Sequence, residues 1–426
     1  MSDPQMEVGA IINSILLKQN DISLNADDVL KDLRLLRNLC ARGSEIQFQI
    51  ASNEDLQTFL QSLLFVASDN AESIKQLQTI GWQLMANMIV NNPQSQTIVW
   101  QKHGSNILQQ CLDTQMILDR KVDVMLMIVY NVMRSASATS LVQLPLVLRA
   151  VVCVWHSILE QKCSLQFDFL HFIFEEFLVK DGRNTVKCYA QLSTNDRLTF
   201  LDYLINYLRQ DSPNGLVHTF LLQHISKEFK IKSDCILRVA SLQEVDKMKP
   251  QEAYALLRCI ASASGSENYS ELYATDHSLF LNVSSLLRCL VQASKESANT
   301  IFTPMNKLEE VAPTSTISPD YQSEISYELK TLLVRCIANL LYNNDTNKGY
   351  CLDTQLMPAL FECTNMDARN PLMKEWSILA IRNACIGCPE IQQVIANLTS
   401  QGPAKNEILT ELNLDLGSLR INPSKE

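Results

Sequence analysis

Residues 333–340 read Leu-Val-Arg-Cys-Ile-Ala-Asn-Leu, and residues 378–384 read Ile-Leu-Ala-Ile-Arg-Asn-Ala. Both stretches run from aliphatic residues through an arginine to an asparagine, and Asn339 and Asn383 lie 44 residues apart (383 − 339). A fixed period in the forties is typical of helical units that stack into a solenoid. Since a solenoid offers a long surface and rarely a catalytic pocket, the period favours binding over chemistry.

Three stretches nearer the N-terminus follow the same asparagine template: Leu-Leu-Arg-Asn-Leu-Cys at 35–40, Leu-Met-Ala-Asn-Met at 84–88 and Ile-Val-Tyr-Asn-Val at 128–132. Their asparagines are Asn38, Asn87 and Asn131, spaced by 49 (87 − 38) and 44 (131 − 87) residues. Short polar runs follow two of the five copies, at 91–96 and 342–347. Each copy therefore predicts a helix that ends in a polar turn before the next helix begins.

The composition is typical of a globular, helical protein. The chain has 426 residues, of which 46% are hydrophobic, with 11 Gly and 13 Pro. Strand-like alternation is scarce, whereas long stretches rich in Leu, Ile and Val have helical spacing. Together with the repeat period, this predicts an all-α fold, an armadillo-like α-solenoid in which stacked helical repeats form a right-handed superhelix.

Charge and cysteine usage exclude several classes of protein. The net charge of −10 argues against nucleic-acid binding, which needs a basic stripe, and against docking on anionic membranes. No apolar run reaches the length of a membrane span, and residues 1–5 do not begin a signal peptide. The 13 Cys are scattered along apolar helical runs, which fits reduced thiols in the cytosol. We expect a cytoplasmic location.

Pattern and composition divide the chain into four parts. Residues 1–298 are expected to form an N-terminal armadillo-like superhelix, although the template does not fit its middle part and leaves open whether 150–298 continue the repeat. Residues 299–325, crowded with Pro, Ser and Thr, are expected to form a linker. Residues 326–400 hold a C-terminal pair of repeats, and 401–426 form a polar tail.

Two helix starts are predicted from capping signals. Ser193 stands three residues before Asp196, which is the spacing of a capping box. Asn370 precedes Pro371, so that pair predicts an N-cap followed by a proline in the first turn of the helix that carries Trp376.

No catalytic, cofactor or metal site is predicted. The phosphate-binding glycine motifs and the nucleophile motif Gly-x-Ser-x-Gly are missing, and the six His have no regular ligand spacing. Cys385 and Cys388 have the spacing of half a zinc site, but no second pair lies at a suitable distance. Because Pro389 follows directly, we interpret this pair as the end of a helix.

The repeated asparagines, a ladder of Asn38, Asn87, Asn131, Asn339 and Asn383, have two interpretations. In the structural one, which we favour, each amide bonds to the backbone of a neighbouring repeat. In the functional one, the amides hold an extended peptide, as in armadillo transport receptors. Those receptors pair each asparagine with a tryptophan one turn earlier, whereas Trp82 and Trp376 stand five (87 − 82) and seven (383 − 376) residues before theirs. A receptor for extended peptide cargo is therefore the alternative hypothesis.

The C-terminal part resembles the ataxin-10 family. The most specific feature is the order Asn-Pro at 370–371, Glu-Trp at 375–376 and Ala-Ile-Arg-Asn at 380–383, preceded by 333–344 and Met-Pro at 357–358. Residues 299–304 resemble the family's junction before this domain, and 35–40 resemble its N-terminal repeat. The chain departs from the family pattern at Ala338, at Asn347-Lys348 and at Ala384, which are packing variations.

The resemblance implies a non-enzymatic scaffold or adaptor linked to neuronal survival, neurite outgrowth and cytokinesis. It implies partners among signalling, glycosylation or cytokinesis proteins, and a homo-oligomer is a further option. The helix at 375–383 supplies the candidate protein-binding residues Glu375, Trp376, Arg382 and Asn383, although a merely solvated or salt-bridged helix face is the simpler interpretation. Because the chain is acidic, we expect partner segments that carry basic residues.

Overall fold

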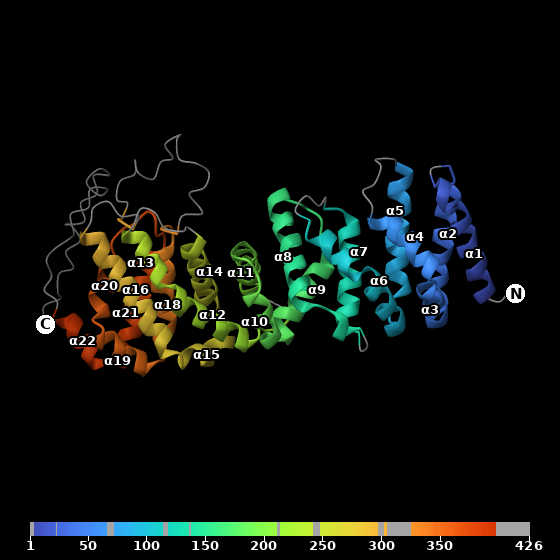
Figure 1. Ribbon diagram of the computed structural model, residues 1–426. Coiled ribbons are helices and arrows are strands. Elements are labelled where there is room, and N and C mark those ends of the chain that lie inside the picture. The colour runs from blue at the N-terminus through green and yellow to red at the C-terminus, as the bar shows by residue number, and fades with distance from the viewer. Residues whose placement is uncertain are drawn as a thin grey trace, which may run out of the picture. The chain divides into compact units, whose positions relative to one another are not determined.

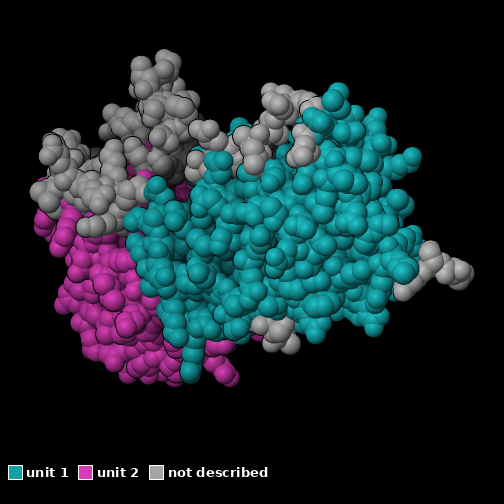
Figure 2. All heavy atoms as spheres, turned by 45° about the vertical axis from the view of Figure 1, so that its right-hand side comes forward, with its two compact units in different colours: residues 1–200 teal, residues 201–426 magenta. Residues whose placement is uncertain are grey.

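The structure is a computed structural model that describes residues 4–22, 24–65, 72–113, 118–135, 138–210, 214–241, 248–296, 302–304 and 325–397. All regular structure in these ranges is helical, and none of it is β-strand (Figure 1). The all-α fold class predicted from the sequence is confirmed. Helix contacts divide the chain into two compact units, residues 1–200 and residues 201–426, which Figure 2 colours separately.

Unit 1 is built from two rows of helices that stack in chain order (Figure 1). Its helices are α1 (Pro4–Lys18), α2 (Ala26–Leu39), α3 (Ser44–Ser52), α4 (Glu54–Phe65), α5 (Glu72–Met88), α6 (Pro93–Cys111), α7 (Arg120–Met133), α8 (Leu144–Gln161), α9 (Asp168–Glu175) and α10 (Gly182–Ala190). In one row α2, α5, α7 and α9 pack successively, and in the other α3, α6, α8 and α10 do. The template asparagines Asn38, Asn87 and Asn131 all lie in the first row, so the sequence repeat is also a repeat in space.

Unit 2 repeats this two-row arrangement. After α11 (Thr194–Leu208), within which the boundary of the units falls, come α12 (Thr219–Lys232), α13 (Asp234–Ser241), α14 (Met248–Ala263), α15 (Ser270–Ala274), α16 (His277–Glu296), α18 (Leu329–Leu341), α19 (Asp345–Asp353), α20 (Leu356–Glu362), α21 (Met373–Cys385) and α22 (Pro389–Ala396). One row is α12, α14, α18 and α21, and the other contains α13, α16 and α20. Each unit is thus a stack of helical repeats; the right-handed, armadillo-like superhelix stays a prediction.

Helix α18 lies at the centre of unit 2. It packs against α14, α16 and α21, and of its thirteen residues only Arg335 and Asn339 are not fully buried. A helix that is apolar on nearly every side needs neighbours all round. The sequence of α18 therefore demands that helices from both rows and from the following repeat enclose it.

The turns between helices show the 44-residue period more sharply than the helices do. Asn343 and Gly387, 44 residues apart (387 − 343), both have positive φ angles, of 50° and 72°, and end α18 and α21. Glu328 and Leu372, again 44 apart (372 − 328), have φ angles of 58° and 61° at the starts of the same helices. Left-handed backbone is uncommon outside glycine, so its recurrence at fixed spacing marks two copies of one structural unit.

Side-chain caps complete the turns after two of the template helices, α5 and α18. The Asn344 Oδ1 atom accepts from the Asn347 amide at 3.1 Å, and the Asn92 Oδ1 atom accepts from the Ser95 amide at 3.2 Å. Each caps the helix that follows. The capping amides also reach back, since Asn92 donates to the Ser44 carbonyl and Asn344 to the Ala274 carbonyl, both at 2.9 Å. One asparagine therefore both begins a helix and ties it to the preceding repeat.

Of the two predicted helix starts, one is confirmed and one is wrong. The Ser193 hydroxyl oxygen accepts from the Asp196 backbone amide at 3.2 Å, so Ser193 caps α11, and the hydroxyl also donates to the Asp196 carboxylate at 2.8 Å. Asn370 does not cap α21, which begins at Met373. Its Oδ1 atom instead accepts from the backbone amide of Lys330, in the first turn of α18, at 2.9 Å. A side chain from the next repeat therefore caps α18.

A buried polar cluster anchors the start of α18. The Lys330 side chain donates to the Phe302 carbonyl at 2.8 Å and lies 3.4 Å from the Asp367 carboxylate. Asn370 donates to Asp367 at 2.8 Å, and Arg369 donates to the Thr303 carbonyl at 3.4 Å. Residues 302–304, the described part of the expected linker, are thereby attached to unit 2. Residues 305–324 and 401–426 lie outside the described ranges, and the four predicted boundaries stay predictions.

One helix in the described part of the chain, α8, is long and apolar enough to cross a membrane by length and composition. Its side chains Val147, Leu148 and Val151 are buried in unit 1, where α8 packs beside α6, α9 and α10. The buried share of this helix is 39%, so one side of it packs within unit 1.

Candidate functional site

The structure places the five template asparagines in three kinds of environment. Three amides reach the backbone of the preceding row member: Asn87 to the Arg37 carbonyl at 3.5 Å, Asn339 to the Ala261 carbonyl at 3.5 Å, and Asn383 to the Ala338 carbonyl at 3.0 Å. Asn339 also donates to the Ser264 hydroxyl at 3.1 Å. These contacts have the geometry of the structural interpretation, in which the amide joins neighbouring repeats.

The remaining two asparagines make only local contacts. Asn38 is exposed and accepts from the guanidinium of its neighbour Arg37 at 3.0 Å. Asn131 donates to the Met127 carbonyl of its own helix at 2.9 Å. The five side chains therefore do not form one array that faces a common groove.

The four candidate binding residues on α21 lie at different depths. Glu375 and Arg382 are exposed, Trp376 is half-buried and Asn383 is buried against α18. The Trp376 ring lies beneath the Arg335 guanidinium, 5.2 Å from its central carbon, which is the arrangement of a cation–π contact. Only Glu375 and Arg382 thus face solvent fully.

Three aliphatic residues accompany Glu375 and Arg382 on this side of α21. Leu372, Ile378 and Ile386 are 64%, 53% and 49% exposed. Glu375, Ile378 and Arg382 are three and four residues apart and share one face of α21, and Leu372 and Ile386 are the capping residues at the two ends of this exposed stripe. We call this stripe (Leu372, Glu375, Ile378, Arg382 and Ile386) the α21 outer face. It is an exposed apolar strip with one charge of each sign.

A template copy in α14 escaped the sequence reasoning. Residues 257–261 read Leu-Arg-Cys-Ile-Ala, and 334–338 read Val-Arg-Cys-Ile-Ala, but Ser262 stands where α18 has Asn339. Because the search was keyed to asparagine, the serine hid this copy. A search for Arg-Cys-Ile-Ala would have found it, and with it the equivalent arginines Arg258 and Arg335.

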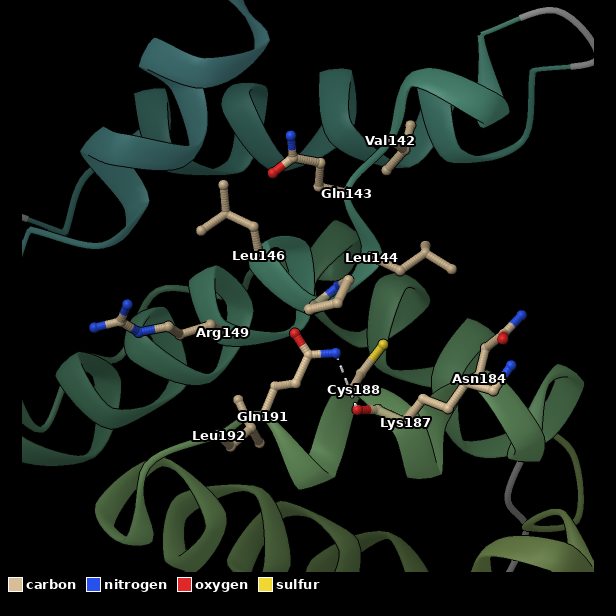
Figure 3. A pocket seen from close by; sticks show the side chains of 11 residues that line it. Val142, Gln143, Leu144, Leu146, Arg149, Asn184, Lys187, Cys188, Gln191 and Leu192 are labelled. Atoms are coloured by element: carbon tan, nitrogen blue, oxygen red, sulfur yellow. Dashed lines mark hydrogen bonds between the residues drawn. The ribbon is translucent and has the colours of Figure 1, made fainter.

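A hollow of about 610 Å³ lies between the start of α8 and α10 in unit 1 (Figure 3). It is lined by Val142, Gln143, Leu144, Pro145, Leu146, Arg149, Asn184, Lys187, Cys188, Gln191 and Leu192. Apolar and amide side chains dominate, and no carboxylate lines it. Burial raises the pKa of the Cys188 thiol to about 11, so it stays protonated at neutral pH. The hollow holds no activated nucleophile and no acid–base pair.

Two groups that could carry chemistry, His103 and the pair Cys385 and Cys388, lie in structural surroundings. His103 contacts Gln57 at 2.8 Å, and burial lowers its pKa to about 4, so it is neutral at pH 7. Cys385 ends α21 and Cys388 directly precedes α22, with Gly387 in the turn between them. Within the described ranges, no three His, Cys, Asp or Glu residues are grouped as metal ligands.

The two-row stacks, the joined repeats and the exposed helix face define a helical-repeat protein of the α-solenoid class. Comparison with known proteins then gives the family. Residues 329–419 match the model of the spinocerebellar ataxia type 10 protein domain. Ataxin-10 of Bos taurus is 24% identical over 395 residues, which cover 90% of this chain and 78% of that protein.

Two further relatives agree with this assignment. Ataxin-10 of Homo sapiens is 23% identical over 392 residues, which cover 90% of this chain and 78% of that protein. The ataxin-10 homolog of Dictyostelium discoideum is 35% identical over 88 residues, or 21% of this chain and 14% of that protein. Residues 329–419 therefore carry the domain of the ataxin-10 family, and the chain as a whole is similar to ataxin-10, as the residues at 370–383 indicated. Ataxin-10 is not a known enzyme family, and the similarity supports a protein-interaction role in general.

Proposed function

We propose that the chain is a scaffold or adaptor that holds partner proteins on the α21 outer face. The observation that carries the proposal is the exposure of Ile378 on α21 and of Leu372 and Ile386 at its two ends, beside the exposed Glu375 and Arg382. Leaving three aliphatic side chains in water costs free energy that burial in an interface recovers, at about 25 cal/mol per Å². Contiguous exposed apolar surface is typical of protein-binding sites.

The charges on the same stripe specify the chemistry of the partner. Glu375 and Arg382 are seven residues apart (382 − 375), about two helical turns or roughly 10 Å. The matching partner is an amphipathic helix of another protein, with an apolar strip flanked by a cation opposite Glu375 and a carboxylate opposite Arg382. Charges at the rim of such an interface set its register more than its affinity.

The biological setting suggested by the family belongs to the same proposal. It comprises neuronal survival, neurite outgrowth and cytokinesis, with signalling, glycosylation or cytokinesis proteins as partners and a cytoplasmic, perinuclear, midbody or centrosome location. Formation of a homo-oligomer is a further part of it. The alternative, a receptor for extended peptide cargo, needs free asparagine amides. The contacts of Asn87, Asn339 and Asn383 with backbone carbonyls favour the scaffold.

The test compares Ile378→Glu with a matched substitution, Ile231→Glu, by proximity labelling in dividing and neuronal cells. Ile231 is 63% exposed on α12 of the same unit, so both variants place the same charge on an exposed helix. We expect Ile378→Glu to lose a defined set of partners that Ile231→Glu keeps. Each lost partner is then purified and retested against Glu375→Arg and Arg382→Glu.

Circular dichroism of the purified variants checks that the helical content is unchanged. The proposal fails if the two Ile→Glu variants label the same partners, or if charge reversal at 375 and 382 leaves every purified partner bound as before.

A further inference from the structure

Three arginines of unit 2 form a row that the sequence reasoning did not use. Arg258 on α14 and Arg335 on α18 occupy equivalent places in the template, and α14 packs directly against α18. Arg209, just after α11, is close enough to act electrostatically on Arg335 and on Cys259, the neighbour of Arg258. We call Arg209, Arg258 and Arg335 the arginine row. The row runs from the end of α11 across α14 and α18, which pack in succession with α21 (Figure 1).

Aromatic rings accompany the row. Arg335 lies over the Trp376 ring at 5.2 Å. Tyr254, one turn before Arg258 on α14, is half-buried and lies within electrostatic reach of Arg258 and Arg209. An arginine that stacks on a ring keeps its hydrogen-bonding edge free for a ligand.

The row is not neutralised by the described part of the chain. None of the three guanidiniums has a carboxylate within 4.0 Å among the described residues, and the buried Nε atom of Arg335 has no acceptor there. Two carboxylates on the surrounding elements act electrostatically on neighbours of the row: Asp202 on α11 acts on Cys259, and Glu328 before α18 acts on Tyr254. Burial and the neighbouring Arg209 both lower the pKa of Arg335, which shows that its charge is held at a cost.

Such an arrangement is unexpected in a chain with a net charge of −10. Acidic residues are plentiful, yet none pairs with the row in the described ranges, and like charges held together destabilise the folded state. A ligand that brings its own carboxylates relieves this repulsion, because the guanidinium fork binds a carboxylate with two parallel hydrogen bonds.

We propose that the arginine row holds an extended acidic segment of a partner protein, with carboxylates on Arg258 and Arg335 and apolar side chains against Tyr254 and Trp376. This proposal requires an acidic partner segment, whereas the net charge of the chain alone predicts a basic one. The arginine row and the α21 outer face share no residue and are tested by different variants, so either proposal can fail while the other stands.

Single-stranded nucleic acid is the other ligand that pairs phosphates with arginine and bases with aromatic rings. Two observations favour the peptide. First, the net negative charge of the chain repels a long polyanion. Second, three cations make a positive track that is short compared with the grooves that bind a nucleic-acid backbone.

The experiment selects ligands for the full chain from a displayed library of random peptides about twelve residues long. We expect the enriched peptides to carry Asp or Glu beside aliphatic or aromatic residues. The most enriched peptide is then labelled with fluorescein and titrated against Arg258→Gln/Arg335→Gln. Binding should weaken about tenfold for each arginine lost, since each removes a charge-assisted contact, and it should weaken further in added NaCl.

The matched control is Arg288→Gln/Lys227→Gln, which also removes two positive charges from unit 2 but leaves the arginine row unaltered. Arg288 is exposed on α16 within Leu-Leu-Arg-Cys-Leu at 286–290, a local sequence close to that of α14, but it lies in the other row of helices. The control should bind the peptide within about twofold of the unaltered chain, since screened distant charges contribute little.

Three outcomes would overturn the proposal. One is a selection that enriches no acidic peptides. Another is equal binding by Arg258→Gln/Arg335→Gln and the control. The third is tighter binding of an oligouridylate of about twelve nucleotides that displaces the peptide, which would assign the row to nucleic acid.

Discussion

Helices α2 and α5 of unit 1 and helices α18 and α21 of unit 2 form two repeats that follow the same asparagine template. The two repeats bury the template side chains to different depths. The Asn87 amide is half-exposed and 3.5 Å from its carbonyl, whereas the Asn383 amide is buried and 3.0 Å from its carbonyl. Helix α2 keeps Leu35 and Asn38 in solvent, while α18 is enclosed on nearly every side. The template specifies which helices stack, and the neighbouring segments decide how strongly each stack is held.

The largest effect should come from the buried polar cluster that only the C-terminal repeat places at its helix start. Replacing Lys330 with Met removes the cation that faces Asp367, and both side chains are almost fully buried. Losing one partner of a buried ion pair costs about 3–5 kcal/mol. We expect faster hydrogen exchange, read by mass spectrometry, in peptides from α18 and α21.

The control for Lys330 is the surface pair Arg42 and Glu7 in unit 1, whose atoms are 2.9 Å apart with both side chains well exposed. Arg42→Met should cost less than about 1 kcal/mol. Equal exchange rates for Lys330→Met and the unaltered chain would show that the cluster does not hold the C-terminal repeat.

A pH effect should be largest in unit 1, since burial lowers the pKa of His103 strongly, whereas the pKa of His224 in unit 2 shifts in the same direction by less. Burial lowers the pKa of His103 to about 4 from its usual 6.5. Between pH 4 and pH 6.5 His103 therefore binds a proton in the unfolded chain but not in the folded chain. Stability is therefore complete above pH 6.5 and falls by up to about 3 kcal/mol as the pH drops to 4.

Urea unfolding followed by tryptophan fluorescence at pH 7 and pH 4.5 measures this loss, with Trp82 and Trp100 as reporters in unit 1. His103→Gln can still contact Gln57 and should flatten the pH dependence. An unchanged pH dependence in that variant would assign the loss to other groups.

The smallest effect compares the two asparagines directly. Asn383→Ala leaves a buried carbonyl of Ala338 without its donor and should cost about 1–3 kcal/mol. Asn87→Ala, with a longer and half-exposed contact, should cost less than about 1 kcal/mol. Thermal melts of the two variants give the order. If Asn87→Ala is the more damaging, depth of burial does not explain the difference between the repeats.

The helical class and the repeat period could be predicted from sequence because both rest on local spacing. The template stretches at 84–88 and 378–384 lie within α5 and α21, and the stretch at 35–40 ends one residue after α2. The copy in α14 was missed because Ser262 replaces the asparagine, although Arg-Cys-Ile-Ala stood unchanged. The role of Asn370 was misjudged because a cap can act through space on a helix forty residues earlier (370 − 330).

Only part of the candidate site could be anticipated. Glu375 and Arg382 were placed on one face by helical spacing, and they are exposed. Asn383 was grouped with them, but α18 covers it, and that contact depends on how the repeats stack. The arginine row was invisible for the same reason, since Arg258 and Arg335 become neighbours only when α14 packs against α18.

The attachment of residues 302–304 to the start of α18 has a practical consequence for dissecting the chain. Phe302 is almost fully buried and its carbonyl accepts from Lys330, while α16 and α18 pack against each other on either side of residues 305–324. A protease cut within 305–324 would therefore leave two pieces that co-elute as a noncovalent complex and separate only in denaturant. The same position suits a split-reporter fusion, in which two separately expressed pieces reassemble by docking α18 into the site between α14 and α16.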